Sequence, residues 1–476
     1  MTSVPSSSLE RSVRGSVRTD PGGLAPFGHD QSHLSGTPRA VVAPADADDV
    51  VALVRWARRE RVPLVARGAG TSLDGESVPT DGAVVVDLSG WNAVLEVDPG
   101  ELSARVGPGV VNRDLQNALR PHGVFFPPNP GSWTVATIGG HVGTNASGPR
   151  SFRYGPTRAW VRGLEAVLGT GERARFGTRV AKRSVGPDLL QLLVGSEGTL
   201  GIVTEVTVRL APMPAHREGL VYPLEETTKL GAVARRLRGA PGTGLSAVEY
   251  LDRGSAAVLA QRRNAEWPAD APLLLVEVES DDPREAPTRR ERVSAALRSV
   301  GLHRAPIVFG DADELWTLRG ASGVALDERM GRRIREDVAV PLGRVDELVH
   351  RFEEIARDQG VALYLYGHLG EGSFHPNFVV DPTTAAGDRI RAAVLNAALA
   401  LGGTISSEHG IGRTKVGYLE REVGRVGLEL LEVAKRRCDP DRILNPGKLY
   451  PSRSHRVGGR PSPWLSGPAA EGTPPG

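Results

Sequence analysis

Hydrophobic residues in the first half of the chain follow a helical spacing, then a strand-like run, then a loop. Residues 48–61 place Val51, Val54 and Ala57 three residues apart, which predicts a helix, and the apolar run at 62–66 predicts a strand. Further strands are predicted over 83–88, 94–97 and 103–106, and an amphipathic helix over 110–122. The first half is therefore predicted to be α+β, with many loops between the elements.

The hydrophobic pattern changes after Pro212 and Pro214, where a domain boundary is predicted. Longer alternating runs, as at 271–279, and helical stretches, as at 345–356, replace the glycine-rich loops. Both ends of the chain are rich in Ser, Gly and Pro and show little apolar periodicity, which is typical of disorder. The predicted organisation is a disordered tail over 1–34, a first domain over 35–214, a second domain over 215–400, a C-terminal segment over 401–450 and a disordered tail over 451–476.

Length, charge and cysteine content narrow the class of protein. At 476 residues the chain exceeds the roughly 250–300 residues at which one hydrophobic core stops growing, so more than one domain is expected. Its net charge of +2 gives no strong field for nucleic acid or an anionic membrane, which favours a small-molecule ligand. The single cysteine, Cys438, excludes a disulfide framework within this chain and fits a cytoplasmic protein. No run reaches the ~18 apolar residues of a membrane span.

Three glycine-rich loops lie in the first half, at 67–75, 126–148 and 193–204. The first follows an apolar strand, where consecutive N–H groups can surround a diphosphate because glycine permits close approach and positive φ. Its glycine spacing matches neither the Rossmann nor the Walker pattern, so on its own a plain turn explains it equally well. Three such loops in one domain instead indicate that they flank a flat cofactor.

Histidines gather in two segments of the second half, 366–377 and 406–415. Strands predicted over 362–366 and 374–380 would form a hairpin that brings His368 and His375 together. Because side chains alternate along a strand, Asn377 is expected on the face that carries His375.

Two imidazoles and a carboxylate are a common ligand set for a divalent metal, above all zinc, and Glu408 can supply the carboxylate. The glycines at 410 and 412 allow an irregular loop in which Glu408 and His409 face one cavity. The alternative is that the two hairpin histidines only satisfy hydrogen bonds and that residues 408–409 form an exposed turn.

The three glycine-rich loops together closely resemble the FAD-binding domain of the vanillyl-alcohol oxidase type, also called PCMH-type. Over about 35–450 the chain is most similar to the branch with D-lactate dehydrogenases, glycolate oxidase catalytic subunits and D-2-hydroxyglutarate dehydrogenases. This resemblance implies a two-subdomain FAD-binding domain, an α+β cap domain with an antiparallel sheet, and a C-terminal segment that returns to the flavin. It also implies non-covalent FAD, because the first loop lacks the histidine that attaches flavin elsewhere in the superfamily. The residues expected to bind FAD are Arg67, Gly68, Ala69, Gly70, Thr71, Ser72, Pro127, Pro128, Asn129, Thr137, Gly140, Thr144, Asn145, Ser147, Glu197, Gly198, Ile202 and Asn445.

The same resemblance implies that a 2-hydroxy acid such as D-lactate, glycolate or D-2-hydroxyglutarate is oxidised to the 2-keto acid by hydride transfer to flavin. The metal at His368, His375 and Glu408 would orient the substrate, and His409 would act as the base. The family segments at 315–319 and 335–341 carry the cation that meets the substrate carboxylate. The expected catalytic residues are His409, Arg319, Arg335 and Asn377.

Two other activities share this flavin domain. One is the transferase reaction of proteins like alkyl-dihydroxyacetone-phosphate synthase, whose histidine-rich segment favours His where Glu408 stands here. The other is an oxidase reaction with dioxygen. For the dehydrogenase, one cysteine cannot hold an iron–sulfur relay, so a separate acceptor is expected: an electron-transfer flavoprotein, a quinone or an iron–sulfur partner. A homodimer is included among the expected assemblies.

Overall fold

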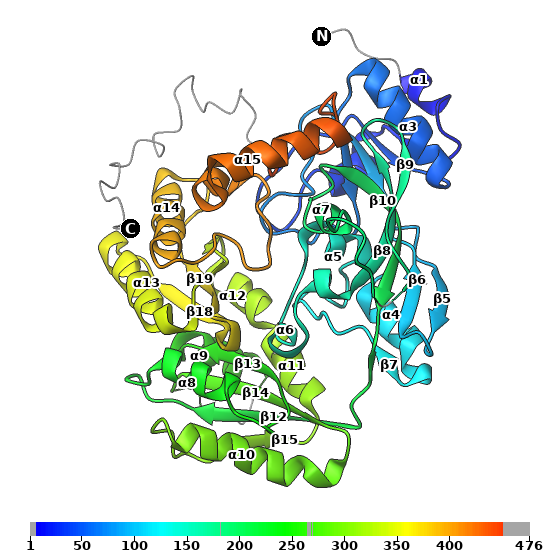
Figure 1. Cartoon of the computed structure of the whole chain (residues 1–476). Coiled ribbons are helices and arrows are strands. Elements are labelled where there is room, and N and C mark those ends of the chain that lie inside the picture. Colours follow the sequence, from blue (N-terminus) through cyan, green and yellow to red (C-terminus); the bar gives the residue numbers. More distant parts are fainter. Residues whose placement is uncertain (1–5, 181, 264–267, 269, 451–476) are drawn as a thin grey trace, which may run out of the picture.

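The computed structural model describes residues 6–180, 182–263, 268 and 270–450. Figure 1 shows the N-terminal half, in blue to teal, as one lobe and the green to yellow part as a second lobe. Helix α15 (Leu419–Cys438), in orange, lies along the upper side of the molecule in this view. The predicted mixture of helices and strands is confirmed. No helix in these ranges is long and apolar enough to cross a membrane.

The first lobe begins with a small sheet that includes part of the predicted N-terminal tail. Its strands, in the order β1-β2-β4-β3, are β1 (Ser16–Arg18), β2 (Ala40–Ala43), β4 (Val84–Asp87) and β3 (Leu64–Arg67). Helix α3 (Ala47–Glu60) packs Val50, Leu53 and Val54 against this sheet. Strands β2, β4 and β3 run parallel, and each is a short apolar run, as expected for buried parallel strands.

The prediction of disorder over residues 1–34 is wrong for 6–34. Helix α1 (Ser6–Glu10) buries Leu9 in the core under α3, and β1 pairs antiparallel with β2. Arg14 also forms an ion pair with Asp49 of α3. The segment is ordered by these few long-range contacts, which leave no periodic signal in its composition. The predicted tail over 451–476 lies outside the described residues.

The second sheet of this lobe is antiparallel, in the order β5-β6-β10-β8-β9. Helices α4 (Asn112–Leu119) and α5 (Ile138–Thr144) pack on it through Leu115, Leu119 and Val142. Its strands are β5 (Val94–Asp98), β6 (Ser103–Val106), β10 (Gly201–Arg209), β8 (Val161–Leu168) and β9 (Arg173–Gly177), and β7 (Val124–Phe125) pairs with β11 (Ala211–Pro212) beside it. The lobe therefore has two subdomains, as predicted.

The second lobe is built on one antiparallel sheet in the order β15-β12-β14-β13-β18-β19-β16, with β17 also pairing with β19. Alternation along β14 sends Leu274 and Val276 to one face and Leu273 and Leu275 to the other. The strands are β12 (His216–Pro223), β13 (Leu245–Leu251), β14 (Leu273–Ser280), β15 (Ile307–Phe309), β16 (Ile334–Arg335), β17 (Val338–Ala339), β18 (Leu363–His368) and β19 (Ser373–Phe378).

Helices cover both faces of this sheet. The face with Leu274 packs against α8 (Leu230–Arg238), α10 (Ala286–Arg298), α13 (Val345–Gln359) and α14 (Ala385–Ala400). The opposite face packs against α9 (Arg253–Arg263), α11 (Ala312–Gly320) and α12 (Ser322–Met330). The antiparallel cap sheet is thus confirmed.

The two lobes are in contact, and the C-terminal end of the described chain returns to the first lobe. Helix α6 (Ser151–Tyr154) of the first lobe packs on β13, and Arg150 forms an ion pair with Glu277 of β14 at 2.9 Å. At the C-terminal end the chain returns to the first sheet, where Leu64 N–H donates to Ile443 O (2.7 Å) and Asn445 N–H donates to Leu64 O (2.8 Å). The predicted return of the C-terminal segment to the first domain is therefore present.

Candidate functional site

The first lobe contains a cavity with about 790 Å³ of empty space, part of it open to solvent. All three glycine-rich loops contribute to its lining, which also includes Ala66, Glu76, Ser77, Leu88, Pro108, Gly139, Gly143, Leu193, Ser196, Gly201 and Val203.

Two positions in the first glycine-rich loop, 67–75, have no room for a side chain. A Cβ on Gly68 would lie 2.1 Å from Thr137 Oγ1, so the loop touches the residue that precedes α5. Gly70 has φ +68°, and a Cβ there would lie 2.1 Å from Arg67 Nη2. Any side chain at either position would push the loop away from α5 or strain it. The two glycines are therefore needed for this loop to pack closely against Thr137 and Arg67 at the cavity.

Most of the residues expected to bind FAD lie on this cavity, and the others lie beside it. Those on the cavity are Arg67, Gly68, Ala69, Gly70, Thr71, Ser72, Thr137, Gly140, Thr144, Glu197 and Gly198. Those outside its lining are Pro127, Pro128, Asn129, Asn145, Ser147, Ile202 and Asn445. Pro128 and Asn129 make backbone and side-chain hydrogen bonds with Asn112 and Arg150 instead.

The side chain of Ile202 faces away from the cavity. It is fully buried in the hydrophobic core, while its neighbours Gly201 and Val203 line the cavity. Successive side chains on β10 point to opposite faces, so only alternate residues can reach the ligand side.

Two buried glutamates form part of the cavity wall. Glu197 accepts hydrogen bonds from Ile411 N–H (2.6 Å) and Gly412 N–H (3.0 Å). These bonds tie the first lobe to the second histidine segment, 406–415. Burial raises the pKa of Glu197 to about 7, although these hydrogen bonds act in the opposite direction. Burial and the neighbouring Glu197 charge also raise the pKa of Glu76 well above its usual value. Asn445 lies just outside the lining and donates hydrogen bonds to the backbone oxygens of Glu76 and Glu197. It therefore holds together the two segments that contain these glutamates.

The predicted hairpin brings the two histidines together. Strands β18 and β19 are antiparallel with Tyr366 opposite His375, and His368 Nε2 lies 3.4 Å from His375 Nε2. Glu408 Oε1 lies 3.2 Å from His368 Nε2 and 3.3 Å from His375 Nε2. The other Glu408 oxygen accepts a hydrogen bond from Ser147 Oγ at 3.2 Å, so the first lobe contacts this cluster directly.

The spacing of these three ligand atoms fits a metal ion. Ligand atoms about 2.0–2.2 Å from a tetrahedral zinc lie roughly 3.3–3.6 Å from one another. The cluster of His368, His375 and Glu408 shows separations of 3.2, 3.3 and 3.4 Å. Burial opposes ionisation of Glu408, but the two histidines outweigh it and hold the pKa of this carboxyl well below its usual value. Donor type and separation therefore suit a divalent cation.

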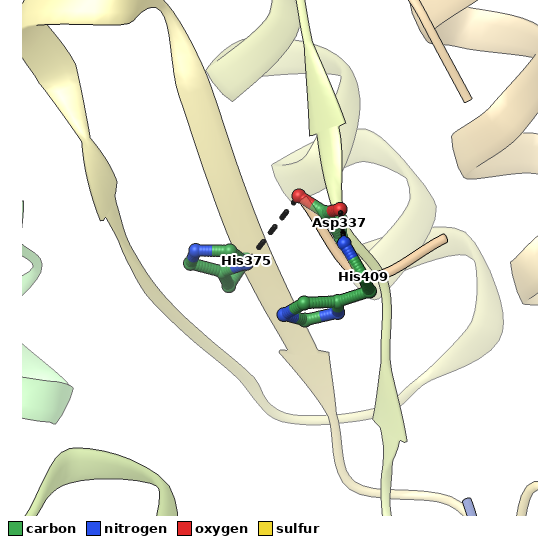
Figure 2. Close-up of side chains that lie close together, drawn as sticks. All are labelled: Asp337, His375 and His409. Carbon is green, nitrogen blue, oxygen red and sulfur yellow. Dashed lines mark hydrogen bonds and ion pairs between the residues drawn. The ribbon is translucent and has the colours of Figure 1, made fainter. Parts of the chain in front are cut away.

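Asp337 shapes the loop that carries Glu408 and His409, and sequence reasoning missed it. Its Oδ2 accepts the N–H groups of Ser407, Glu408 and His409 at 2.8–2.9 Å. Its Oδ1 lies 3.7 Å from His375 Nδ1, as Figure 2 shows. Asp337, His375 and His409 could also surround a cation, but the backbone bonds occupy Oδ2 and the Ser407 hydroxyl donates to Oδ1. The sequence signal that could have identified Asp337 is its position two residues after Arg335, within the segment 335–341.

His409 lies against the cluster. Its ring stacks on His375 with centroids 5.0 Å apart, and its Nε2 is 3.7 Å from Glu408 Oε1. Glu408 and His409 therefore reach the same site, as expected for the irregular loop. Burial lowers the pKa of His409, and the Asp337 carboxylate offsets this only in part.

Glu249 on β13 is a second residue that the sequence reasoning missed. Its Oε1 lies 2.5 Å from His368 Nδ1, and its Oε2 lies 2.7 Å from Arg319 Nη2. Its signal in the sequence was a lone carboxylate within the apolar strand 245–251.

The expected substrate-binding residues have different surroundings. Arg319 is buried and paired with Glu249, and its guanidinium lies 4.7 Å from the Tyr366 ring centroid. Arg335 is 14% exposed and has a long contact of 3.5 Å with Asp327.

Asn377, one of the expected catalytic residues, is fully buried in the cap sheet. Its amide donates to the backbone oxygens of Tyr364 and His375 and accepts from Arg333 Nε. These bonds support the hairpin that carries the two histidines.

Comparison with known proteins agrees with this arrangement. Residues 38–177 match the family described as FAD binding domain, and residues 213–449 match FAD linked oxidases, C-terminal domain. The glycolate oxidase subunit GlcD of Bacillus subtilis is 34% identical over 424 residues, which cover 87% of this chain and 89% of that protein. A D-lactate dehydrogenase of Archaeoglobus fulgidus is 34% identical, covering 86% and 90% of the two chains. A D-2-hydroxyglutarate dehydrogenase of Stutzerimonas stutzeri is 31% identical, covering 92% and 96%.

Solved structures show that the fold is shared more widely. p-Cresol methylhydroxylase superposes with a TM-score of 0.76 at 16% identity, covering 91% of this chain and 93% of that one. Alkyldihydroxyacetonephosphate synthase superposes with a TM-score of 0.68 at 18% identity, covering 91% and 82%. At such identities the likeness concerns the fold alone, whereas the sequence relatives cover nearly the whole chain. The chain therefore belongs to the FAD-linked oxidases and is an FAD-linked oxidoreductase of the branch that contains glycolate oxidase, D-lactate dehydrogenase and D-2-hydroxyglutarate dehydrogenase.

Proposed function

We propose that this protein is an FAD-dependent dehydrogenase that converts a 2-hydroxy acid to the 2-keto acid. The observation that carries the proposal is the cluster of His368, His375 and Glu408, with ligand atoms 3.2–3.4 Å apart and His409 stacked beside it. Ser147 joins this cluster to the flavin lobe. Glycolate, D-lactate and D-2-hydroxyglutarate, named in the relatives, are all 2-hydroxy acids.

Each part of the site has a role in this proposal. FAD in the first-lobe cavity would accept the hydride, which is the chemistry that the cofactor supplies. A divalent metal, with zinc as the expected ion, would polarise the substrate hydroxyl. His368, His375 and Glu408 would hold that ion, and three protein ligands leave a position open for substrate.

The remaining residues bind substrate and move its proton. Arg335, with only a long contact to Asp327, is the most available cation for the substrate carboxylate. Arg319 uses two of its five N–H donors on Glu249, and the others can contribute to the same carboxylate. His409 would accept the hydroxyl proton at Nε2, the nitrogen that lies 3.7 Å from Glu408.

Electrons must leave through another molecule in this proposal. The chain has one cysteine, so it cannot hold a cysteine-ligated iron–sulfur relay. We propose an electron-transfer flavoprotein, a quinone or an iron–sulfur partner protein as the acceptor.

The proposed reaction is tested by mixing the purified holoenzyme anaerobically with separate D- and L-2-hydroxy acids and recording the flavin absorbance. One enantiomer of a small 2-hydroxy acid is expected to bleach the flavin, with the 2-keto acid as product. If none of them bleaches it, the proposal is wrong and the transferase reaction becomes the leading alternative. Rapid reoxidation in air with stoichiometric hydrogen peroxide would instead identify an oxidase.

We expect the flavin to be bound without a covalent link. None of the described residues that line the cavity is Cys, His or Tyr, the side chains able to form such a link, and Cys438 lies outside the lining. Acid precipitation of the holoenzyme should therefore release all of the yellow colour into the supernatant. Colour that stays with the washed precipitate after proteolysis would contradict this expectation.

A further inference from the structure

We propose that Glu249 is a positioning residue that fixes His368 and Arg319 relative to each other, so that metal binding and substrate-carboxylate binding depend on one side chain. The inference rests on the proposed function, because it assigns His368 to the metal and Arg319 to the substrate. Glu249 lies on β13, beside β18 in the cap sheet, and is 0% exposed.

The contact with His368 determines which ring nitrogen is available. Glu249 Oε1 lies 2.5 Å from His368 Nδ1, and a carboxylate at this distance holds a proton on that nitrogen. The opposite nitrogen, Nε2, is then left to face His375 Nε2 at 3.4 Å and Glu408 Oε1 at 3.2 Å. Carboxylates behind metal-ligating histidines act in this way: they fix the tautomer and the ring orientation.

The contact with Arg319 uses the other carboxylate oxygen. Arg319 Nε donates to Glu249 Oε2 at 3.0 Å, and Nη2 lies 2.7 Å from the same atom. The guanidinium also lies over Tyr366, whose ring is 5.4 Å from His375. Contacts therefore run in a closed circuit from Glu249 through Arg319, Tyr366, His375 and His368 back to Glu249.

The partners of Glu249 distinguish it from an ordinary buried glutamate. Glu277 on the next strand pairs with Arg150 across the lobe interface. Glu165 in the flavin lobe pairs with Arg173 and Arg175. The two partners of Glu249 that the contacts show are instead a proposed metal ligand and a proposed substrate-binding residue. A buried carboxylate is costly without a cation, and Arg319 supplies that cation while the other oxygen of Glu249 contacts His368.

The test measures metal affinity of the FAD-loaded enzyme by competition with a chromophoric zinc chelator. Glu249→Gln keeps the shape of the side chain but removes the charge, and loss of an outer-shell carboxylate typically weakens metal binding about 10–100-fold. We expect that loss, together with a raised KM for the 2-hydroxy acid and unchanged FAD content. Glu249→Asp keeps the charge and should restore part of the affinity. Glu165→Gln, which removes a buried charge far from the site, should leave metal affinity unchanged.

The outcomes separate the inference from the function on which it rests. If the wild-type enzyme binds no zinc yet bleaches with a 2-hydroxy acid, the metal site and the role of Glu249 both fail while the reaction stands. If the wild type binds zinc and Glu249→Gln matches it within about threefold, only the role of Glu249 is overturned. If Glu165→Gln weakens zinc binding equally, the effect is general destabilisation and the inference fails. Should Glu249→Gln not fold, the same comparison is made with Glu249→Asp, for which wild-type affinity and KM would overturn the inference.

Discussion

Replacing His409 by asparagine should slow flavin reduction by the substrate about 100-fold or more, the usual scale for a lost general base. The hydroxyl must lose its proton as hydride departs, and His409 Nε2 is the nitrogen beside the cluster, 3.7 Å from Glu408 Oε1. Its backbone N–H is anchored on Asp337, so the substitution changes the ring and leaves the loop in place. Anaerobic stopped-flow measurement of the flavin band gives the rate directly.

Metal and flavin content decide how a slow His409→Asn variant is interpreted. Three protein ligands suffice for a catalytic zinc with an open position, so both contents should match the wild type. Loss of metal would make His409 a ligand, and near-normal flavin reduction would remove it from the mechanism. The matched control is His350→Asn, which changes an exposed histidine on α13 and should leave the rate unchanged.

Removal of the metal should abolish substrate-dependent flavin reduction while the flavin stays bound. The proposed ligands lie on the cap hairpin and the 406–415 loop, and the flavin cavity is lined by the first lobe, so a chelator can empty one site without the other. We expect the flavin absorbance to persist after chelation and activity to return when zinc is added back. Metal analysis and activity are measured on the same sample.

The variant His375→Ala provides an independent check of the same site. It deletes one of the ligand atoms that lie 3.2–3.4 Å apart, so the purified variant should contain little metal and show almost no flavin reduction. Active wild-type enzyme without metal, or a His375→Ala variant with full metal and activity, would show that the ligands are wrongly assigned.

The parts of the site that could be predicted are local in sequence. The hairpin that unites His368 and His375 needs only strand alternation and a tight turn between residues seven apart. The glycine-rich loops are equally local, since each is defined by a continuous run of small residues. Glu408 was predicted to lie near the histidines because two imidazoles and a carboxylate are a common ligand set for a divalent metal.

The parts that escaped prediction depend on contacts between distant segments. Glu249 is 119 residues from His368, and the pairing of β13 with β18 brings the two together. Asp337 is 72 residues from His409 and binds the backbone of a loop that belongs to no strand. The hydrophobic pattern of a single sequence does not reveal which distant segments contact each other. The direction of the Ile202 side chain was missed for a different reason: alternate residues of its strand point away from the cavity. The order of residues 6–34 likewise depends on partners outside that segment.

The return of the C-terminal segment also means that the support of the first-lobe cavity is completed late in biosynthesis. Asn445 and Lys448 bond to the backbone at Glu76 and Val78, across 369 and 370 residues of chain. Domains generally fold from the N-terminus as they leave the ribosome, but contacts of this separation must wait until residues 445–448 have been made. A fragment ending near residue 214 would therefore lack part of the support for its own binding site.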